Sequence, residues 1–144
     1  MPSYIEMEWI DETVAIGSWV DHRRHGLQKL QGIDLSMNAR SLFDERFFFV
    51  GRRPNTTRVI RAAELLLELS NKGVKVMVHC YHGRDRSAFM VMVYLSKKLG
   101  LNYTEVFDIV RQGRPRAKFH QDWVDILTAE INEPLNAVIP GSEQ

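Results

Sequence analysis

The feature that most constrains the fold of this chain is the segment 74–87, in which an apolar strand leads through a polar loop into a helix. Residues 74–78 are rich in valine, which favours a buried β-strand. The only cysteine, Cys80, lies at the end of this strand, and the apolar run from Ala88 to Leu95 predicts the helix. This order of elements predicts an α/β core.

The loop between the strand and the helix has the layout of an anion-binding site. The first N–H groups of a helix have no acceptor within the helix, and a loop that curls there turns further N–H groups inward. Such a ring of donors holds a tetrahedral oxyanion well. Cys80 is expected at the floor of this ring, with Gly83 where the loop turns most sharply.

The same layout gives Cys80 a chemical role. A sulfur that points into N–H donors at a helix N-terminus is stabilised as a thiolate, which is the nucleophilic form. Arg86 lies six positions later, and its planar guanidinium can hold two phosphoryl oxygens at once. Ser87 is expected close enough to donate a hydrogen bond to the sulfur when it leaves a phosphocysteine.

The residues at the two ends of this loop are His79-Cys80 and Arg86-Ser87, separated by five others. They resemble the HC-x5-R-S/T signature of cysteine-dependent phosphatases, and the short flanks are similar to the dual-specificity group. The resemblance implies a phosphocysteine mechanism without a metal or other cofactor, in which Cys80 attacks phosphorus and His79 supports the thiolate from behind. The phosphate-binding residues that it implies, besides Arg86, are Tyr81, His82, Gly83, Arg84 and Ser87.

The general acid is where this sequence departs from the dual-specificity group. Those enzymes usually take an aspartate from a separate loop, which here corresponds to Gly51–Asn55 and holds no carboxylate. General acid catalysis is worth roughly a hundredfold to ten-thousandfold, so the departure matters for mechanism.

Three possibilities for the general acid stay open. Asp85, directly before Arg86, occupies the place where myotubularin-type and Sac-type phosphoinositide phosphatases carry an aspartate; its alternative role is to cap the loop or orient Arg86. Asp44 lies at a nearly suitable distance along the chain, but is otherwise a surface turn residue. A substrate with a good leaving group would need no acid, and RNA 5′-triphosphatases of this superfamily illustrate that case.

The whole-chain properties indicate a single globular domain. The chain has 144 residues, 44% of them apolar, and a formal net charge of +1, which does not indicate nucleic acid or membrane binding. One cysteine excludes a disulfide framework, and the chemistry needs a reduced thiol, so a cytoplasmic location is expected. The sequence shows no targeting segment, and its longest apolar run is too short to span a bilayer.

Periodicity and turn residues predict the remaining elements. The expected architecture is a single α/β domain with a short, mostly parallel central sheet flanked by helices, and a phosphate-binding loop between a central strand and a helix. Residues 1–131 are expected to form the catalytic domain and residues 132–144 a C-terminal tail. Besides the central strand and its helix, the prediction has one or two strands in 8–17, strands at 33–39 and 46–50, and helices at 20–31, 56–71, 104–112 and 118–131.

The leading hypothesis for function is a phosphatase acting on phosphotyrosine, with phosphoserine and phosphothreonine as further substrates, so the expected partner is a phosphorylated protein or another phosphate-rich substrate.

His82 and Arg84 could add charge for a second phosphate, and Arg52 and Arg53 could flank the mouth of the site, or all four could be ordinary surface residues. The alternatives are a phosphoinositide phosphatase or an RNA 5′-triphosphatase with the same loop, and a phosphate-binding module without efficient catalysis. The other histidines lack metal-ligand spacing and are interpreted as surface or satisfied core residues; they are His22, His25 and His120.

Overall fold

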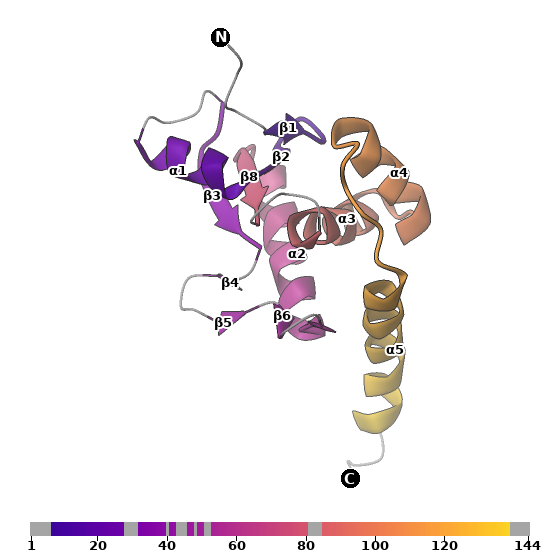
Figure 1. Cartoon of the computed structure of the whole chain (residues 1–144). Helices are drawn as coiled ribbons and strands as arrows, with labels where there is room; N and C mark the ends of the chain where they lie inside the picture. The colour runs from indigo at the N-terminus through magenta and orange to yellow at the C-terminus, as the bar shows by residue number, and fades with distance from the viewer. Residues whose placement is uncertain are drawn as a thin grey trace.

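The computed structural model describes residues 7–27, 32–39, 41–42, 46–47, 49–50, 53–80 and 85–138. Helices lie around a small central sheet (Figure 1). The strands are β1 (Glu8–Trp9), β2 (Val14–Gly17), β3 (Leu35–Asn38), β4 (Ser41–Leu42), β5 (Arg46–Phe47), β6 (Phe49–Val50), β7 (Arg53–Pro54) and β8 (Val76–His79). The helices are α1 (Trp19–Leu27), α2 (Thr56–Asn71), α3 (Arg86–Leu99), α4 (Tyr103–Gly113) and α5 (Gln121–Val138).

The central sheet has the strand order β1-β2-β8-β3, with β8 between two parallel neighbours and β1 antiparallel at the edge. His79, the last residue of β8, is opposite Gly17 of β2 and Asn38 of β3. The three parallel strands therefore end at the same level, and Cys80 follows at this carboxyl edge. Ligand sites of α/β sheets form at that edge. The predicted fold class is confirmed.

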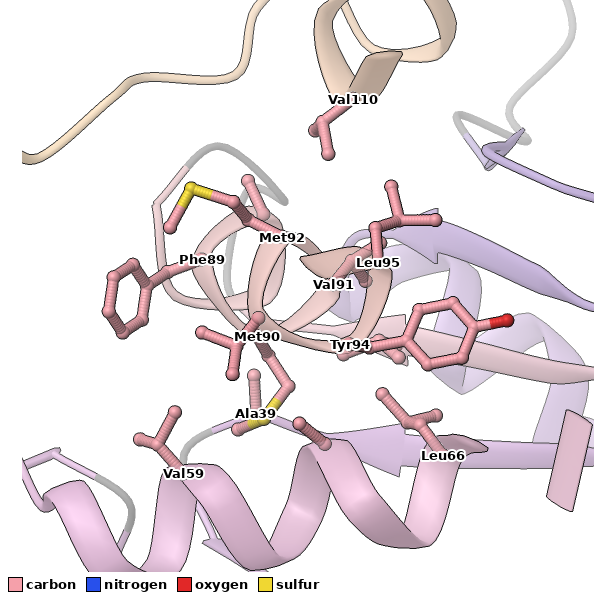
Figure 2. Close-up of a cluster of buried hydrophobic side chains, with 14 of the residues drawn as sticks. Ala39, Val59, Leu66, Phe89, Met90, Val91, Met92, Tyr94, Leu95 and Val110 are labelled. Carbon is pink, nitrogen blue, oxygen red and sulfur yellow. The ribbon is translucent and has the colours of Figure 1, made fainter. Parts of the chain in front are cut away.

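Helix α3 forms the centre of the hydrophobic core. Every residue from Ser87 to Leu95 is buried, which is typical of a helix surrounded by other elements on all sides. Figure 2 shows α3 between α2, which contributes Val59 and Leu66, and α4, which contributes Val110. Because α3 is packed on all sides, its N-terminus is held in a fixed position.

The helix boundaries follow from local capping chemistry. The side chain of Asn55 accepts a hydrogen bond from the backbone N–H of Arg58, which starts α2 at Thr56. Gly73 has a φ of +78° just after the helix, a conformation that glycine adopts without strain. At α4, Asn102 and Glu105 form a reciprocal capping box. The helix predicted for 56–71 is confirmed at both ends.

Two elements differ from their predicted extents. The predicted strand 46–50 is divided between β5 and β6, which pair with β4 and β7 and not with the central sheet. β-propensity favours an extended backbone but does not select the partner strand, so the phenylalanines did not indicate where this segment would pair. The last helix starts at Gln121 and continues to Val138, past the predicted end at 131.

A partly buried polar network joins the segment between β1 and β2 to α3. The carboxylate of Asp11 accepts hydrogen bonds from the Tyr94 hydroxyl at 2.6 Å and from Lys98 Nζ at 2.9 Å. Burial opposes ionisation of Asp11, but these bonds, with those from the backbone N–H groups of Thr13 and Val14, outweigh it and lower its pKa. The network therefore stabilises the charged form of the Asp11 carboxylate.

The helices in the described part of the chain include none that is both long and apolar enough to cross a membrane.

Candidate active site

The site forms where β8 ends and α3 begins. Cys80 follows the last residue of β8, and only 7% of its surface is exposed. Its Sγ lies 3.3 Å from the Oγ of Ser87, which is in the first turn of α3 and fully buried. The strand and helix thus hold the nucleophile candidate and the hydroxyl next to each other, as the sequence predicted.

Arg86 is the first residue of α3, directly before Ser87 in the chain, and it is partly buried. The four residues between Cys80 and Asp85 lie outside the described part of the chain, so their predicted phosphate contacts stay predictions. They are Tyr81, His82, Gly83 and Arg84. Asp44 and Arg52 also lie outside it, and Arg53 is described as part of β7.

Asp85 occupies the N-cap position of α3. Its carbonyl accepts the backbone N–H of Phe89 at 2.9 Å, but its side chain makes no capping hydrogen bond. Instead Oδ1 lies 2.7 Å from Nε2 of His120, in the segment before α5. The Asp85 carboxylate therefore does not cap α3, while its alternative role of capping the loop or orienting Arg86 stays a prediction.

His79 is buried and belongs to a cluster of aromatic rings. The His79 ring stacks on the ring of His22 in α1, with centroids 4.2 Å apart and planes at 19°. Trp19 lies next to both rings, and His22 Nδ1 is 2.8 Å from the hydroxyl of Ser36. The interpretation of His22 as a satisfied residue is consistent with this contact, while the stacking was not foreseen.

The His79 ring is neutral at physiological pH. Burial, and then the nearby His22, lower the pKa of His79 to about 4. The ring lies near the backbone of Cys80, which favours its protonated form, but within normal hydrogen-bond geometry neither ring nitrogen has a partner in the described part of the chain. A neutral imidazole supplies no positive charge to a thiolate, and the predicted support of the Cys80 thiolate by His79 from behind stays a prediction.

The sequence did not indicate the contact between Asp85 and His120. The two residues are 35 positions apart, and His120 is outside any recognised signature. Within the described ranges there is no group of three or more His, Cys, Asp and Glu side chains arranged to hold a metal ion.

Known proteins with related sequences support a family assignment. The family model "Dual specificity phosphatase, catalytic domain" matches residues 54–129, more than half of the chain. Protein-tyrosine-phosphatase IBR5 of Arabidopsis thaliana is 30% identical over 115 residues, which cover 75% of this chain and 44% of the relative. The chain spans less than half the length of the curated relatives it matches.

Solved structures support the fold over nearly the whole chain. Human DUSP28 is similar with a TM-score of 0.70 and 18% identity, covering 95% of this chain and 98% of that one. PTPMT1 in complex with PI(5)P has a TM-score of 0.66 and 22% identity, covering 84% of this chain and 91% of that one. The fold, the strand-to-helix junction at Cys80 and the family match agree, and the chain belongs to the dual specificity phosphatase catalytic-domain family.

Proposed function

We propose that this chain is a cysteine-dependent phosphatase that hydrolyses phosphomonoesters, with phosphotyrosine and then phosphoserine and phosphothreonine in proteins as substrates. The observation that carries the proposal is the 3.3 Å contact between Cys80 Sγ and Ser87 Oγ, at the junction of the central strand and α3, in a chain of this family. The sulfur lies next to the first turn of a buried helix, and the N–H groups of such a turn favour the binding of an anion.

The reaction proceeds in two displacements at phosphorus. The Cys80 thiolate forms an S–P bond while the P–O bond to the leaving group breaks, and Asp85 gives its proton to the leaving oxygen. Arg86 and the loop N–H groups stabilise the three equatorial oxygens. Water then attacks phosphorus and returns a proton to Asp85, the S–P bond breaks, and Ser87 donates a hydrogen bond to the departing thiolate.

Cys80→Ser tests the mechanism. This variant removes the sulfur and is expected to lose turnover of an aryl phosphate completely while still binding inorganic phosphate, which the loop and Arg86 contact. When turnover of a ³²P-labelled substrate is quenched in acid, the wild-type protein is expected to retain covalently bound label. The Cys80→Ser variant is expected to retain none. Turnover that persists in Cys80→Ser would end the proposal, and a Cys80-independent label would exclude the phosphocysteine.

A phosphoinositide is the second candidate substrate. PTPMT1, a structure of similar fold, was solved in complex with PI(5)P, and Asp85 stands inside the loop, where phosphoinositide phosphatases of the myotubularin and Sac types carry an aspartate. An RNA 5′-triphosphate end is the third candidate substrate.

A side-by-side assay distinguishes the three candidates. Wild type and Asp85→Asn are each assayed with phosphotyrosine peptide, phosphatidylinositol phosphate and a 5′-triphosphorylated oligonucleotide. Ester hydrolysis is expected to slow strongly in this variant, because a poor leaving group needs the acid, while anhydride cleavage is expected to change little.

A further inference from the structure

The contact between Asp85 and His120 joins the candidate active site to a segment 35 positions later in the chain. Asp85 directly precedes α3, whereas His120 directly precedes α5. Oδ1 of Asp85 and Nε2 of His120 are 2.7 Å apart, which is a short hydrogen bond. In the tautomer that carries hydrogen on Nε2, the imidazole donates this hydrogen bond to the carboxyl group.

The imidazole of His120 is itself held in place. It stacks on Trp123, with ring centroids 3.8 Å apart and planes at 13°. Trp123 is buried and meets the ring of Phe89 edge to face at 5.4 Å, so the stack rests on the central helix α3. On the other side of the imidazole, Nδ1 lies 4.0 Å from a carboxylate oxygen of Asp122. The ring therefore presents Nε2 to Asp85 from a rigid base.

The Asp85 side chain is free to serve this contact because it does not cap α3. N-cap aspartates ordinarily bond to the N–H groups of the first helical turn. Here the carboxyl group turns to an imidazole from another element, and it remains partly exposed, with 39% of the side chain accessible. One oxygen is occupied by His120 and the group still reaches solvent, as a proton donor must.

We propose that His120 is a positioning residue for the general acid Asp85, an inference that rests on the proposed phosphatase function. The Nε2–H of His120 donates to Oδ1 and leaves Oδ2 as the oxygen that carries the exchangeable proton. When the P–O bond breaks, that proton passes from Oδ2 to the leaving oxygen, and the attacking water returns it in the second displacement. The hydrogen on Nε2 stays on nitrogen throughout, and it holds the carboxylate in one orientation between the two steps.

The test separates the hydrogen bond from the aromatic stack. His120→Phe keeps a ring to stack on Trp123 and removes the donor, while His120→Gln places an amide nitrogen near the position of Nε2 and keeps the donor. Gln121→Ala is the matched control, because Gln121 is an exposed neighbour that bonds Asp125 and not the site. Each variant is assayed with p-nitrophenyl phosphate, whose leaving group hardly needs an acid, and with phenyl phosphate, whose leaving group does.

We expect His120→Phe to lower kcat for phenyl phosphate about tenfold more than it lowers kcat for p-nitrophenyl phosphate. This factor corresponds to the loss of one hydrogen bond to a charged group. KM is expected to change little for either substrate. His120→Gln is expected to recover most of this difference, and Gln121→Ala to behave as wild type. In an Asp85→Asn background, His120→Phe is expected to have no further leaving-group effect, because the acid it positions is gone.

Equal losses on the two substrates, or failure of glutamine to recover the difference, would overturn the inference. If His120→Phe does not fold, as judged by thermal unfolding, His120→Asn replaces it, since its shorter amide does not reach Oδ1. Cys80→Ser, measured in parallel, keeps the two proposals apart. Turnover that does not depend on Cys80 refutes the phosphatase mechanism, whereas Cys80-dependent turnover with an unchanged leaving-group ratio in His120→Phe refutes only the role of His120.

Discussion

The hydroxyl oxygen of Ser87 lies 3.3 Å from the sulfur of Cys80, and both residues are buried between the central strand and the central helix. They are seven positions apart in the sequence and come together where β8 ends and α3 begins. A hydroxyl in this place can donate to a sulfur that carries negative charge. We therefore expect the Ser87 hydroxyl to stabilise the Cys80 thiolate when the S–P bond breaks, and to contribute less to substrate binding.

Ser87→Ala is expected to slow hydrolysis of the phosphocysteine. Loss of one hydrogen bond to a charged group costs about 1.5–3 kcal/mol, so kcat is expected to fall roughly 10- to 150-fold, while the first displacement is less affected. Rapid-quench kinetics would show a burst of product, followed by a slow steady state and accumulated labelled enzyme. Ser87→Thr retains the hydroxyl and is the control; absence of a burst in Ser87→Ala would contradict this role.

The stacked imidazoles of His79 and His22 predict acid sensitivity of the fold. The pKa of His79 is lowered to about 4 by burial and by His22, whereas in the unfolded chain it is about 6.5. The unfolded state therefore binds more protons in this range, and stability that is complete above about pH 6.5 is lost as the pH falls towards 4. The loss is about 3 kcal/mol, from 1.36 kcal/mol for each pKa unit.

Urea unfolding of wild type and His79→Leu between pH 7.5 and 4 measures this effect. The free energy of unfolding of the wild type is expected to fall across this interval, and the fall is expected to be smaller in His79→Leu, which has no proton to bind there. Identical pH dependence in the two proteins would show that His79 is not the titrating group.

The carboxylate of Asp11 predicts a second, more acidic transition. Its pKa in the folded protein is lowered, so its contribution is present above the unfolded pKa of about 4 and is lost as the pH falls through the folded pKa. Asp11→Asn keeps the shape but weakens the bonds from Tyr94 and Lys98, and about 1–3 kcal/mol of stability is expected to be lost at pH 7. The difference from wild type is expected to shrink below about pH 4, because the unfolded chain then binds a proton that the native carboxylate, with its lower pKa, does not yet bind. Chemical unfolding of both proteins at pH 7 and pH 3 measures this difference in the free energy of unfolding. An equal difference at the two pH values would contradict the prediction.

The capping box at α4 provides a test of local stability away from the site. The Asn102 side chain accepts the Glu105 N–H at 2.9 Å, and the Glu105 carboxylate accepts the Asn102 N–H at 3.1 Å. Asn102→Ala is expected to lower the free energy of unfolding by about 1 kcal/mol, and Asn102→Asp, which keeps an acceptor, by much less. Thermal unfolding measures both, and turnover of p-nitrophenyl phosphate is expected to be unaffected because Asn102 does not touch the site.

Local sequence signals were sufficient for the elements that position the site. The strand before Cys80 and the helix after Arg86 were predicted because valine-rich and continuous apolar runs favour buried elements. The helix 56–71 was predicted at both ends, since its apolar spacing stops at a glycine that adopts positive φ. The family is confirmed, and the motif that indicated it could be recognised because its residues are contiguous in the chain.

The sequence by itself determined which residues sit at the strand-to-helix junction, because neighbours in the chain remain neighbours in the fold. Only the tertiary structure decided that His120 bonds Asp85, that His22 stacks on His79, and that the phenylalanine segment pairs outside the central sheet. These contacts join elements far apart in the chain, and their formation depends on how helices and strands pack together. Periodicity reports which face of an element is buried, but it does not report which distant side chain that face meets.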